Sequence, residues 1–284
     1  MQDARPSLTA MRVAIRRAAH QLLDRPRVLD DPLAIPIIGR DAALKVSAAP
    51  RAHQGRVSRS IRAFMAARSR LAEDELARAI SRGTVQYVVL GAGLDTFAYR
   101  SPYPESVLRV FEVDHPATQA WKREKLAAAA IPIPSSVTLA PVDFERQTLA
   151  DGLALARFDR HQPTFFSWLG VTMYLTEAAI ASTFGFIALT PPGGGVVFDY
   201  AVPRSSLGWM GRLAHDAMSR RVAAAGEPFR TFFNSRELRV RLGHIGFRSI
   251  EDLGPDELNA RYFTDRADGL RVRGNLGRLI RAEV

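Results

Sequence analysis

Apolar positions follow two different periods along this chain. In the first 82 residues they recur at helical spacing, most clearly over 8–25 and 57–81. Beyond residue 83, short runs of β-branched and other apolar residues alternate with helical stretches. A run that is apolar at every position is typical of a strand buried on both faces of a parallel sheet. We therefore expect a change near residue 83 from a helical segment to an α/β core.

This core is expected to hold a mostly parallel, doubly wound sheet, because predicted strands and helices alternate along it. The predicted strands are 85–90, 107–113, 136–140, 164–169 and 194–200. The predicted helices between them are 115–130, 146–156 and 176–189. Nearer the C-terminus we expect a helix over 235–242, opened by Asn234 or Ser235, and closing strands over 247–253 and 279–284.

Three segments outside this regular alternation also allow predictions. Asp30-Asp31-Pro32 predicts a helix start with proline in the first turn, and 44–56, which lacks clear periodicity, predicts a loop. Residues 205–226 are rich in Leu, Met and Ala and predict a helical insert. We expect a single domain over 1–284. Its parts are a helical N-terminal cap (1–82) and a Rossmann-like core (83–284) with a helical lid at about 203–233.

Composition narrows the classes of protein. The 284 residues are 47% hydrophobic, enough for a sizeable core, and include no cysteine. Disulfides, thiolate zinc sites and a cysteine nucleophile are thereby excluded, and a reducing compartment is favoured. The first ten residues show no secretory signal, and no apolar run is long enough to span a bilayer. We expect a soluble, cytoplasmic protein.

The net charge of +10 raises the alternative of a nucleic-acid-binding module. The arginines responsible are spread along the whole chain, and no segment alternates basic and aromatic residues as a single-strand binder would. We therefore favour arginine-rich solvated helices over specific nucleic-acid binding.

A glycine-rich turn follows the first predicted strand at Gly91-Ala92-Gly93. Ligands bind at the carboxyl ends of strands in open α/β sheets, and glycine lets the backbone approach them closely. A dinucleotide fingerprint would have a third glycine where Thr96 stands. Asp95 would also repel pyrophosphate, but it could accept from the ammonium group of S-adenosylmethionine (SAM). An NAD(P)-dependent oxidoreductase is thus an alternative that this loop argues against.

Acidic residues stand at the ends of the next two predicted strands. Glu112 and Asp114 close the second strand, where a ribose-binding carboxylate belongs in a nucleoside-binding βαβ unit. Asp143 follows the third strand and is placed to accept from an adenine amino group. Each acid alone could be a helix cap or an ion-pair partner, but acids at consecutive strand ends favour a nucleoside site.

These segments resemble the leucine carboxyl methyltransferase family, and within it an actinobacterial branch of SAM-dependent O-methyltransferases. The likeness covers roughly residues 12–265. It rests on the stretches Asp30–Ala34, Ala67-Arg68, Val88–Arg100, Phe111–Pro116 with Lys122, and Trp168–Leu175. The resemblance implies a class I SAM-dependent methyltransferase fold and SAM as the cofactor.

The resemblance also implies roles for individual residues. Arg68 matches the arginine that holds the SAM carboxylate, and Gly91 and Gly93 match the glycines close to the cofactor. Asp114 matches the ribose-binding acid, which makes Glu112 the weaker candidate. Asp143 and Phe144 match the pair that flanks adenine. Leu169 departs from the family pattern, which often has glutamate there, so the SAM amino group would rely on Asp95 or on backbone carbonyls near Gly91 or Leu169.

The acceptor side is less defined by the sequence. Methyl transfer from a sulfonium needs alignment and water exclusion but no metal, and a hydroxyl acceptor, unlike a carboxylate, would benefit from a base. Tyr174 and His215 are the candidate catalytic residues. The insert offers side chains for an apolar pocket suited to a small lipid, polyketide or aromatic acceptor: Trp209, Met210, Met218, Phe229, Phe232 and Phe233. A homodimer is left open.

Overall fold

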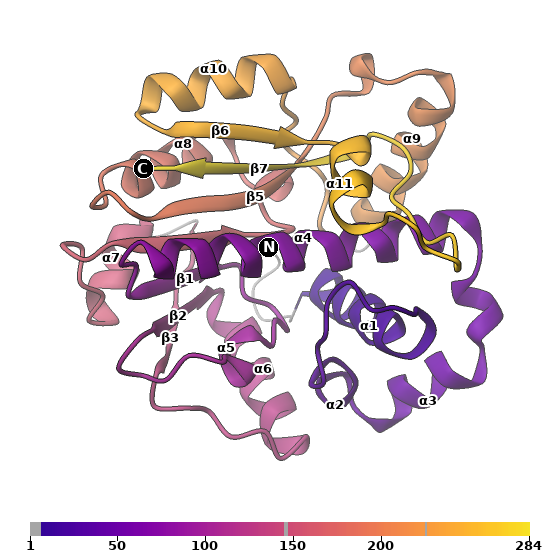
Figure 1. Cartoon of the computed structure of the whole chain (residues 1–284), viewed down its shortest axis with the longest axis horizontal. Helices are drawn as coiled ribbons and strands as arrows, with labels where there is room; N and C mark the ends of the chain where they lie inside the picture. Colours follow the sequence, from indigo (N-terminus) through magenta and orange to yellow (C-terminus); the bar gives the residue numbers. More distant parts are fainter. Residues whose placement is uncertain (1–6, 145–146, 225) are drawn as a thin grey trace.

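The computed structural model describes residues 7–144, 147–224 and 226–284, so the first positions of the predicted cap, the start of the predicted helix 146–156 and one residue of the predicted insert lie outside the described residues. Its centre is a seven-stranded sheet in the order β3-β2-β1-β4-β5-β7-β6 (Figure 1). The strands are β1 (Gln86–Leu90), β2 (Arg109–Asp114), β3 (Val137–Pro141), β4 (Thr164–Trp168), β5 (Gly195–Ala201), β6 (Arg248–Leu253) and β7 (Gly277–Glu283).

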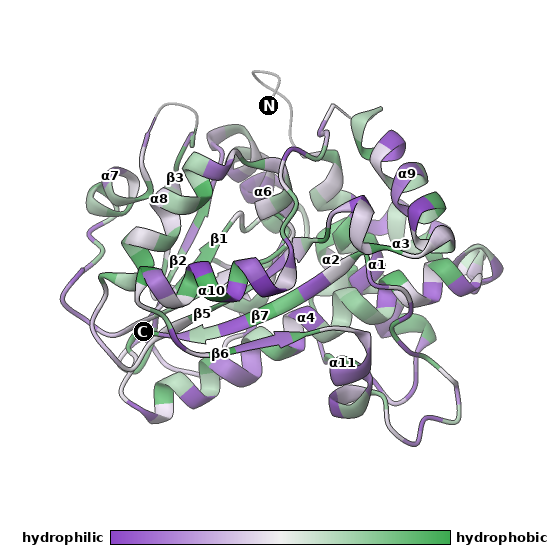
Figure 2. Cartoon of the chain, turned by 90° about the horizontal axis from the view of Figure 1, so that it is seen from above, coloured by the Kyte–Doolittle hydropathy of each residue, from purple (hydrophilic) through white to green (hydrophobic). Residues whose placement is uncertain are grey.

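Strands β1 to β5 pair in parallel, whereas β7 runs antiparallel to both β5 and β6. The mostly parallel sheet predicted from the sequence is confirmed. Its central strands are buried at every position of β1, β4 and β5, because helices cover both faces. The edge strand β6 is polar, with Arg248, Glu251 and Asp252, and Figure 2 shows hydrophilic residues along it. Such an edge discourages pairing with another chain.

Alternate residues of each strand serve the two faces. Tyr87 and Val89 pack into one apolar cluster with helix α4 (Arg56–Ser81), α5 (Phe97–Arg100) and α11 (Pro255–Tyr262). Val88 and Leu90 face a second cluster with α7 (Leu149–Leu155), α8 (Glu177–Ala188) and α10 (Ser235–Ile245). The strand period of two therefore produces a three-layer molecule.

The N-terminal helices pack beside the sheet domain. Helix α1 (Leu8–Leu23) contacts α2 (Ala34–Ile38), α3 (Arg40–Ala48) and α4. Apolar residues of α1 and α2 meet Leu94, from the loop after β1, and Leu126 of α6 (Pro116–Ala128). This arrangement brings α1 to the edge of the sheet where the parallel strands end.

Two local predictions for the N-terminal region are wrong. Asp30-Asp31-Pro32 does not start a helix: α2 begins at Ala34, and Asp31 is instead buried in an ion pair with Arg17. Residues 40–48 form α3, where a loop was expected over 44–56; only the short 3-10 helix η1 (Pro50–His53) and its flanks match. Helix α3 buries Val46 alone, so its sequence carries no apolar stripe to reveal it.

The C-terminal part contains α9 (Trp209–Ala223), which confirms a helix in the predicted insert, and α10, opened by Asn234 as expected. Asn234 Oδ1 accepts from the backbone N–H groups of Arg236 and Glu237. Helix α11 was not predicted, although Pro255 stands in its first turn and Leu258 is fully buried. The remaining short turns are η2 (Thr172–Tyr174) and η3 (Arg204–Ser206).

Candidate active site

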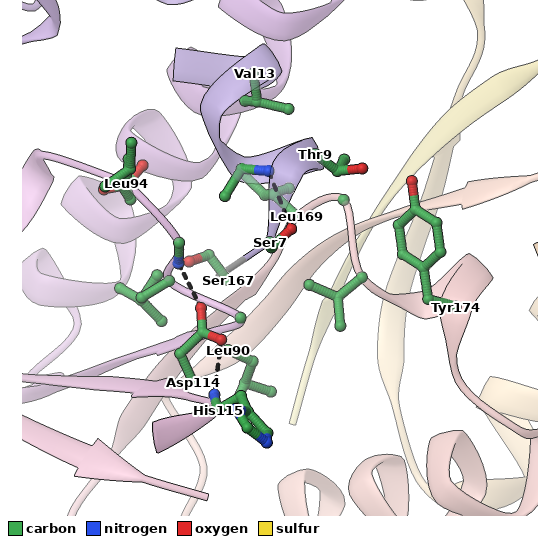
Figure 3. A pocket seen from close by; sticks show the side chains of 18 of the residues that line it. Ser7, Thr9, Val13, Leu90, Leu94, Asp114, His115, Ser167, Leu169 and Tyr174 are labelled. Atoms are coloured by element: carbon green, nitrogen blue, oxygen red, sulfur yellow. Dashed lines mark hydrogen bonds between the residues drawn. The ribbon is translucent and has the colours of Figure 1, made fainter. Parts of the chain in front are cut away.

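A cavity of about 280 Å³ opens where the parallel strands end. Its walls come from the loops after β1, β2, β3 and β4, from α1 and α4, and from the segment 226–230 after α9. In Figure 3, Asp114 and His115 lie at one end, Thr9 and Tyr174 lie toward the other, and Ser7 and Leu169 lie between them. This is the position at which open α/β sheets bind their ligands.

The glycine turn forms one wall of this cavity, as predicted. Gly91 has a φ of +67°, and a Cβ on it would stand 2.2 Å from Cγ2 of Val171. No other residue fits there without displacing Val171 and straining the backbone. Gly93 has a φ of +47°, and its N–H donates to Asp114 Oδ2 at 2.6 Å. The turn is thereby tied to the end of the neighbouring strand.

Asp114 ends β2 and lines the cavity. Its two carboxylate oxygens accept from the N–H groups of Gly93, at 2.6 Å, and His115, at 2.7 Å. Burial raises the pKa of Asp114, although both backbone donors favour the charged form. A carboxylate has about four lone-pair positions, so it can still accept from the two hydroxyls of a ribose.

Glu112 points away from the cavity and has a structural role. It is fully buried, bonded to Lys122 Nζ at 2.7 Å and to the Tyr99 hydroxyl at 2.7 Å. The structure therefore agrees with treating Asp114 as the stronger candidate. His115 acts as the cap of α6, since its Nδ1 accepts from the Ala117 N–H at 3.2 Å.

Arg68 reaches the cavity from the middle of α4. Its Nη1 bonds Asp199 Oδ2 at 2.6 Å, and both side chains are buried. The other Asp199 oxygen accepts from the Gly170 N–H. Gly170 presents no side chain to Arg68, and a Cβ at this position would lie only 3.0 Å from Arg68 Nη1. Sequence reasoning missed Asp199, although a carboxylate inside a run of apolar strand residues was a usable signal.

Asp95 lines the cavity but is already engaged by the protein. Its Oδ1 accepts from the N–H of Phe97, the first residue of α5, at 2.8 Å, and its Oδ2 lies 3.2 Å from Arg17 Nη1. Arg17 is buried and also bonds Asp31 and Thr96. Asp143, Phe144 and Leu169 line the same cavity, so all eight predicted cofactor-binding residues meet there.

The two predicted catalytic residues are separated by the structure. Tyr174 lines the cavity, and burial raises its pKa to about 12, with the charge of Glu227 acting in the same direction. His215 lies on α9 against the Phe232 ring, with Nδ1 3.4 Å from Asp216 Oδ1, and is not among the described residues that line the cavity. A base role for His215 stays a prediction without support from its position.

The insert contributes to the cavity wall other residues than those expected. Trp209 and Met210 are 71% and 66% exposed, and Phe233 belongs to the core. The expected apolar set, including Met218, Phe229 and Phe232, is absent from the described cavity wall; Phe229 instead packs on Tyr174 from outside it. The wall consists of Gly226, Glu227, Pro228 and Arg230, because α9 turns its apolar side chains elsewhere.

Helix α1 supplies a further wall that the sequence analysis did not assign. Ser7, Thr9, Ala10, Val13, Ala14 and Arg17 line the cavity from this helix. Their small and polar side chains carry no motif. Only the docking of α1 against the glycine turn, where Ala10 Cβ would stand 3.1 Å from a Cβ on Gly93, reveals the contact.

These residues fit SAM. The left-handed glycine turn leaves room for a close approach, the half-buried Asp114 keeps free acceptor positions, and Arg68 offers a guanidinium beside Gly170. No trio of acidic and histidine residues that could hold a metal ion occurs in the described part of the chain. Over the same residues, no helix is long and apolar enough to cross a membrane.

Comparison with known proteins points the same way. The family model described as leucine carboxyl methyltransferase matches residues 10–188. The Bacillus subtilis protein named "Putative S-adenosyl-L-methionine-dependent methyltransferase YktD" is 34% identical, over 95% of each chain. A protein of the actinobacterium Mycolicibacterium paratuberculosis, named "Putative S-adenosyl-L-methionine-dependent methyltransferase", is 34% identical over 74% of this chain and 80% of its own. The solved structure of a DUF574 family protein from Streptomyces avermitilis aligns with a TM-score of 0.58 at 16% identity, over 99% of this chain and 98% of its own.

Proposed function

Since this chain belongs to the leucine carboxyl methyltransferase family, we propose that it methylates an oxygen atom of a small, largely apolar molecule. The chain is a SAM-dependent methyltransferase with the class I Rossmann-like fold. The alternatives of an NAD(P)-dependent oxidoreductase and of a non-catalytic nucleic-acid-binding module are therefore set aside. The oxygen, in a carboxylate or a hydroxyl, and the apolar character of the acceptor are our proposal.

In this proposal, the chain holds SAM along the strand ends. Asp114 accepts from the ribose hydroxyls, Asp143 and Phe144 flank the adenine, and Arg68 binds the carboxylate. The SAM amino group is left to Asp95 and to backbone carbonyls, because Leu169 offers no polar group. Gly91 and Gly93 keep the wall free of side chains.

When bound, SAM supplies a methyl group on a sulfonium, which is already a good leaving group. The protein's own contribution is to hold the acceptor oxygen in line and to exclude water. The cavity walls contributed by α1 and by 226–230 suit the second task, because they cover the strand ends from the solvent side. Tyr174 contributes a hydroxyl group near the acceptor.

One observation carries the proposal: a single cavity runs from the glycine turn to Tyr174 and the segment 226–230. It is lined by more apolar than polar side chains, and those away from the glycine turn include Val13, Leu175, Ala179 and Pro228. Such a space beyond the cofactor residues fits a compact apolar acceptor better than a charged peptide.

The test is a set of acceptor assays with methyl-labelled SAM. The candidates are apolar phenols, alcohols and carboxylic acids, amines and thiols of matched size, and peptides ending in leucine. We expect label only in the oxygen-containing small molecules. Labelling confined to the peptide C-termini, or to amines or thiols, would contradict the proposal. The cytoplasmic location, the homodimer and the division into cap, core and lid stay predictions.

A further inference from the structure

Three polar side chains gather at the acceptor end of the cavity. Thr9, Tyr174 and Glu227 all line it, from α1, η2 and the segment after α9. The Tyr174 hydroxyl is turned toward Thr9 (Figure 3). The segment that carries Glu227 packs beside Tyr174: the Phe229 ring lies 5.5 Å from the Tyr174 ring, and the Arg230 N–H donates to the Met173 carbonyl at 2.8 Å. The three groups are therefore neighbours, although 165 and 53 residues separate Thr9 and Glu227 from Tyr174 in the chain.

Two of these groups have unused hydrogen-bonding capacity. Oγ1 of Thr9 and Oε2 of Glu227 are both buried, and neither has a hydrogen-bond partner of normal geometry among the described residues. Thr9 is nevertheless near enough to the Tyr174 hydroxyl to act on its pKa, in the lowering direction. A buried polar atom without a partner destabilises the fold, and it does so more strongly when it is charged. Buried polar atoms are nearly always satisfied in folded proteins, so orphans that face a cavity indicate the ligand that completes them.

We propose that Glu227 and Tyr174, with Thr9, bind a hydroxyl group of the methyl acceptor, so that the enzyme methylates phenols or alcohols in preference to carboxylates. This inference rests on the O-methyltransferase function proposed above. An ionised carboxylate only accepts hydrogen bonds, and Glu227 therefore requires a donor from its ligand. A hydroxyl supplies that donor, whereas a carboxylate acceptor would bring a second negative charge to the same place.

The cationic groups nearby do not reverse this preference. Arg68 is neutralised by Asp199, with 2.6 Å between Nη1 and Oδ2. Arg230 lines the same end of the cavity, but it is exposed to solvent, where its charge is screened. Glu227 itself has no ion pair with any described residue within 4.0 Å. The net charge that the acceptor meets from these groups is thus set largely by Glu227.

The proposed methyl transfer needs no reactant other than SAM, the acceptor and water. A lone pair of the acceptor oxygen forms the new O–C bond to the methyl group, the S–C bond breaks, and its electron pair stays on sulfur. The proton of the hydroxyl passes to the Glu227 carboxylate and from there to water. Tyr174 donates a hydrogen bond to the acceptor oxygen and orients its remaining lone pair.

The test compares matched pairs of small probes: 2-naphthol with 2-naphthoate, and 4-butylphenol with 4-butylbenzoate. Their dissociation constants are measured by ligand-observed NMR on the full chain saturated with S-adenosylhomocysteine. We expect the phenol of each pair to bind more tightly. Glu227→Gln should weaken phenol binding about tenfold, as expected for loss of a charged hydrogen bond, and should strengthen carboxylate binding.

Controls separate site effects from folding effects. Glu124→Gln removes an exposed carboxylate on α6, and Tyr103→Phe removes a hydroxyl outside the cavity; neither should change the preference. Tyr174→Phe should lower phenol affinity while affinity for S-adenosylhomocysteine, measured by calorimetry, stays within about twofold.

Equal affinity for both members of the pairs, no binding of either, or a preference for carboxylates that Glu227→Gln leaves unchanged would overturn the inference. A carboxylate preference would still leave O-methylation intact. Methylation of amines or thiols in the labelling assay would instead defeat the proposed function itself, so the two failures are distinguishable.

Discussion

At the scale of single residues, the cavity depends on groups that leave space or carry charge where the chain folds tightly. Gly91 is the sharpest case, because both its left-handed backbone and the contact with Val171 exclude a side chain. Asp114 and Arg68 show the other requirement. Arg68 is buried and Asp114 half-buried, and each is held in place by partners of the protein's own, two backbone N–H groups for Asp114 and Asp199 for Arg68. Preorganised charges of this kind bind a ligand without first having to order themselves.

Gly91→Ala should weaken binding of S-adenosylhomocysteine by at least tenfold and destabilise the fold by about 1–3 kcal/mol, because the new Cβ displaces Val171 and strains the turn. Calorimetry and denaturant titration measure the two effects. The matched control is Gly185→Ala in α8, where nothing lies within 4 Å of the added Cβ. Unchanged affinity in Gly91→Ala would show that the turn does not contact the cofactor.

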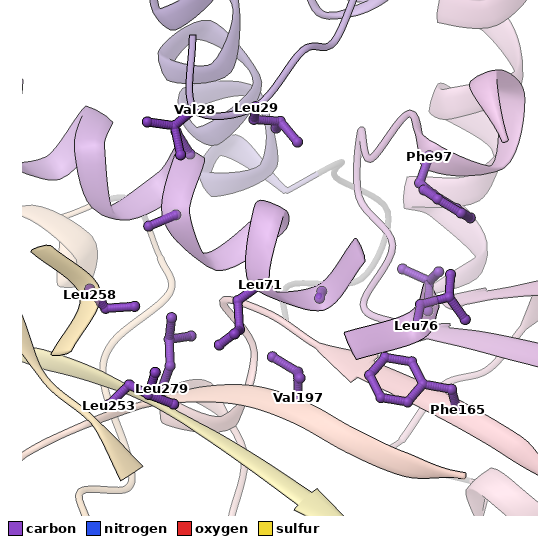
Figure 4. Close-up of a cluster of buried hydrophobic side chains, with 14 of the residues drawn as sticks. Val28, Leu29, Leu71, Leu76, Phe97, Phe165, Val197, Leu253, Leu258 and Leu279 are labelled. Atoms are coloured by element: carbon purple, nitrogen blue, oxygen red, sulfur yellow. The ribbon is translucent and has the colours of Figure 1, made fainter. Parts of the chain in front are cut away.

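At the scale of elements, α4 joins the N-terminal helices to the sheet. Its residues Leu71 and Leu76 pack against Phe165 and Val197 of the strands (Figure 4). Near its N-terminus, Arg62 binds Asp24, which follows α1, through two hydrogen bonds of 2.7 Å. His20 of α1 adds a contact of 2.8 Å to the same carboxylate. One helix therefore fixes α1, and with it a wall of the cavity.

The Asp24 pair should make stability depend on pH in the acid range. Burial alone would raise the pKa of Asp24, but the hydrogen bonds from Arg62 and His20 lower this pKa to about 2. A lowered pKa stabilises the fold above the unfolded value near 3.8, and this contribution is lost as the pH falls toward 2. We expect the wild-type advantage over Asp24→Asn to shrink by about 2 kcal/mol over that range.

Urea unfolding of both proteins between pH 5 and pH 2 measures this difference. Asp30→Asn serves as the control, because Asp30 is an exposed carboxylate that, among the described residues, pairs with Arg27 alone. The stability difference between wild type and Asp30→Asn should hardly change over the same pH range. A constant difference between wild type and Asp24→Asn across the range would mean that the Asp24 carboxylate does not titrate with the fold.

At the scale of the whole molecule, the cavity is where three parts of the chain meet. The N-terminal helices, the strand ends and the segment after α9 each supply a wall. A ligand in this cavity touches all three, so its binding free energy stabilises their contacts together. The C-terminal strands β6 and β7 extend the sheet on the far side of β5 and take no part in the cavity wall.

Saturation with S-adenosylhomocysteine should slow amide hydrogen exchange in residues 8–17 as well as in the glycine turn, because α1 forms a wall of the same cavity. Mass spectrometry of peptides reports the exchange. Helix α10 lies outside the cavity wall and should exchange at an unchanged rate, apart from any global stabilisation. Protection limited to residues 91–95 would mean that α1 does not close over the ligand.

The sequence by itself determined the sheet and the set of cavity residues that we propose hold the cofactor. Strand and helix periods are local, so the βαβ order and every strand were readable, with ends shifted by a few residues. The glycine turn and Asp114 were readable too, because a parallel sheet places all its strand ends at one edge. Helices without an apolar stripe, such as α3, could not be predicted from the spacing of apolar residues.

Only the tertiary structure decided which further groups complete the cavity. The pairing of Arg68 with Asp199 joins residues 131 positions apart, and the wall formed by α1 depends on how that helix docks. The orientation of α9 leaves His215 outside the cavity wall, whereas the segment that follows α9 places Glu227 in that wall. Such choices follow from packing between distant segments, and no spacing along the chain records them. The glycine turn could be read from its own residues, whereas the roles of Asp199, Thr9 and Glu227 could not.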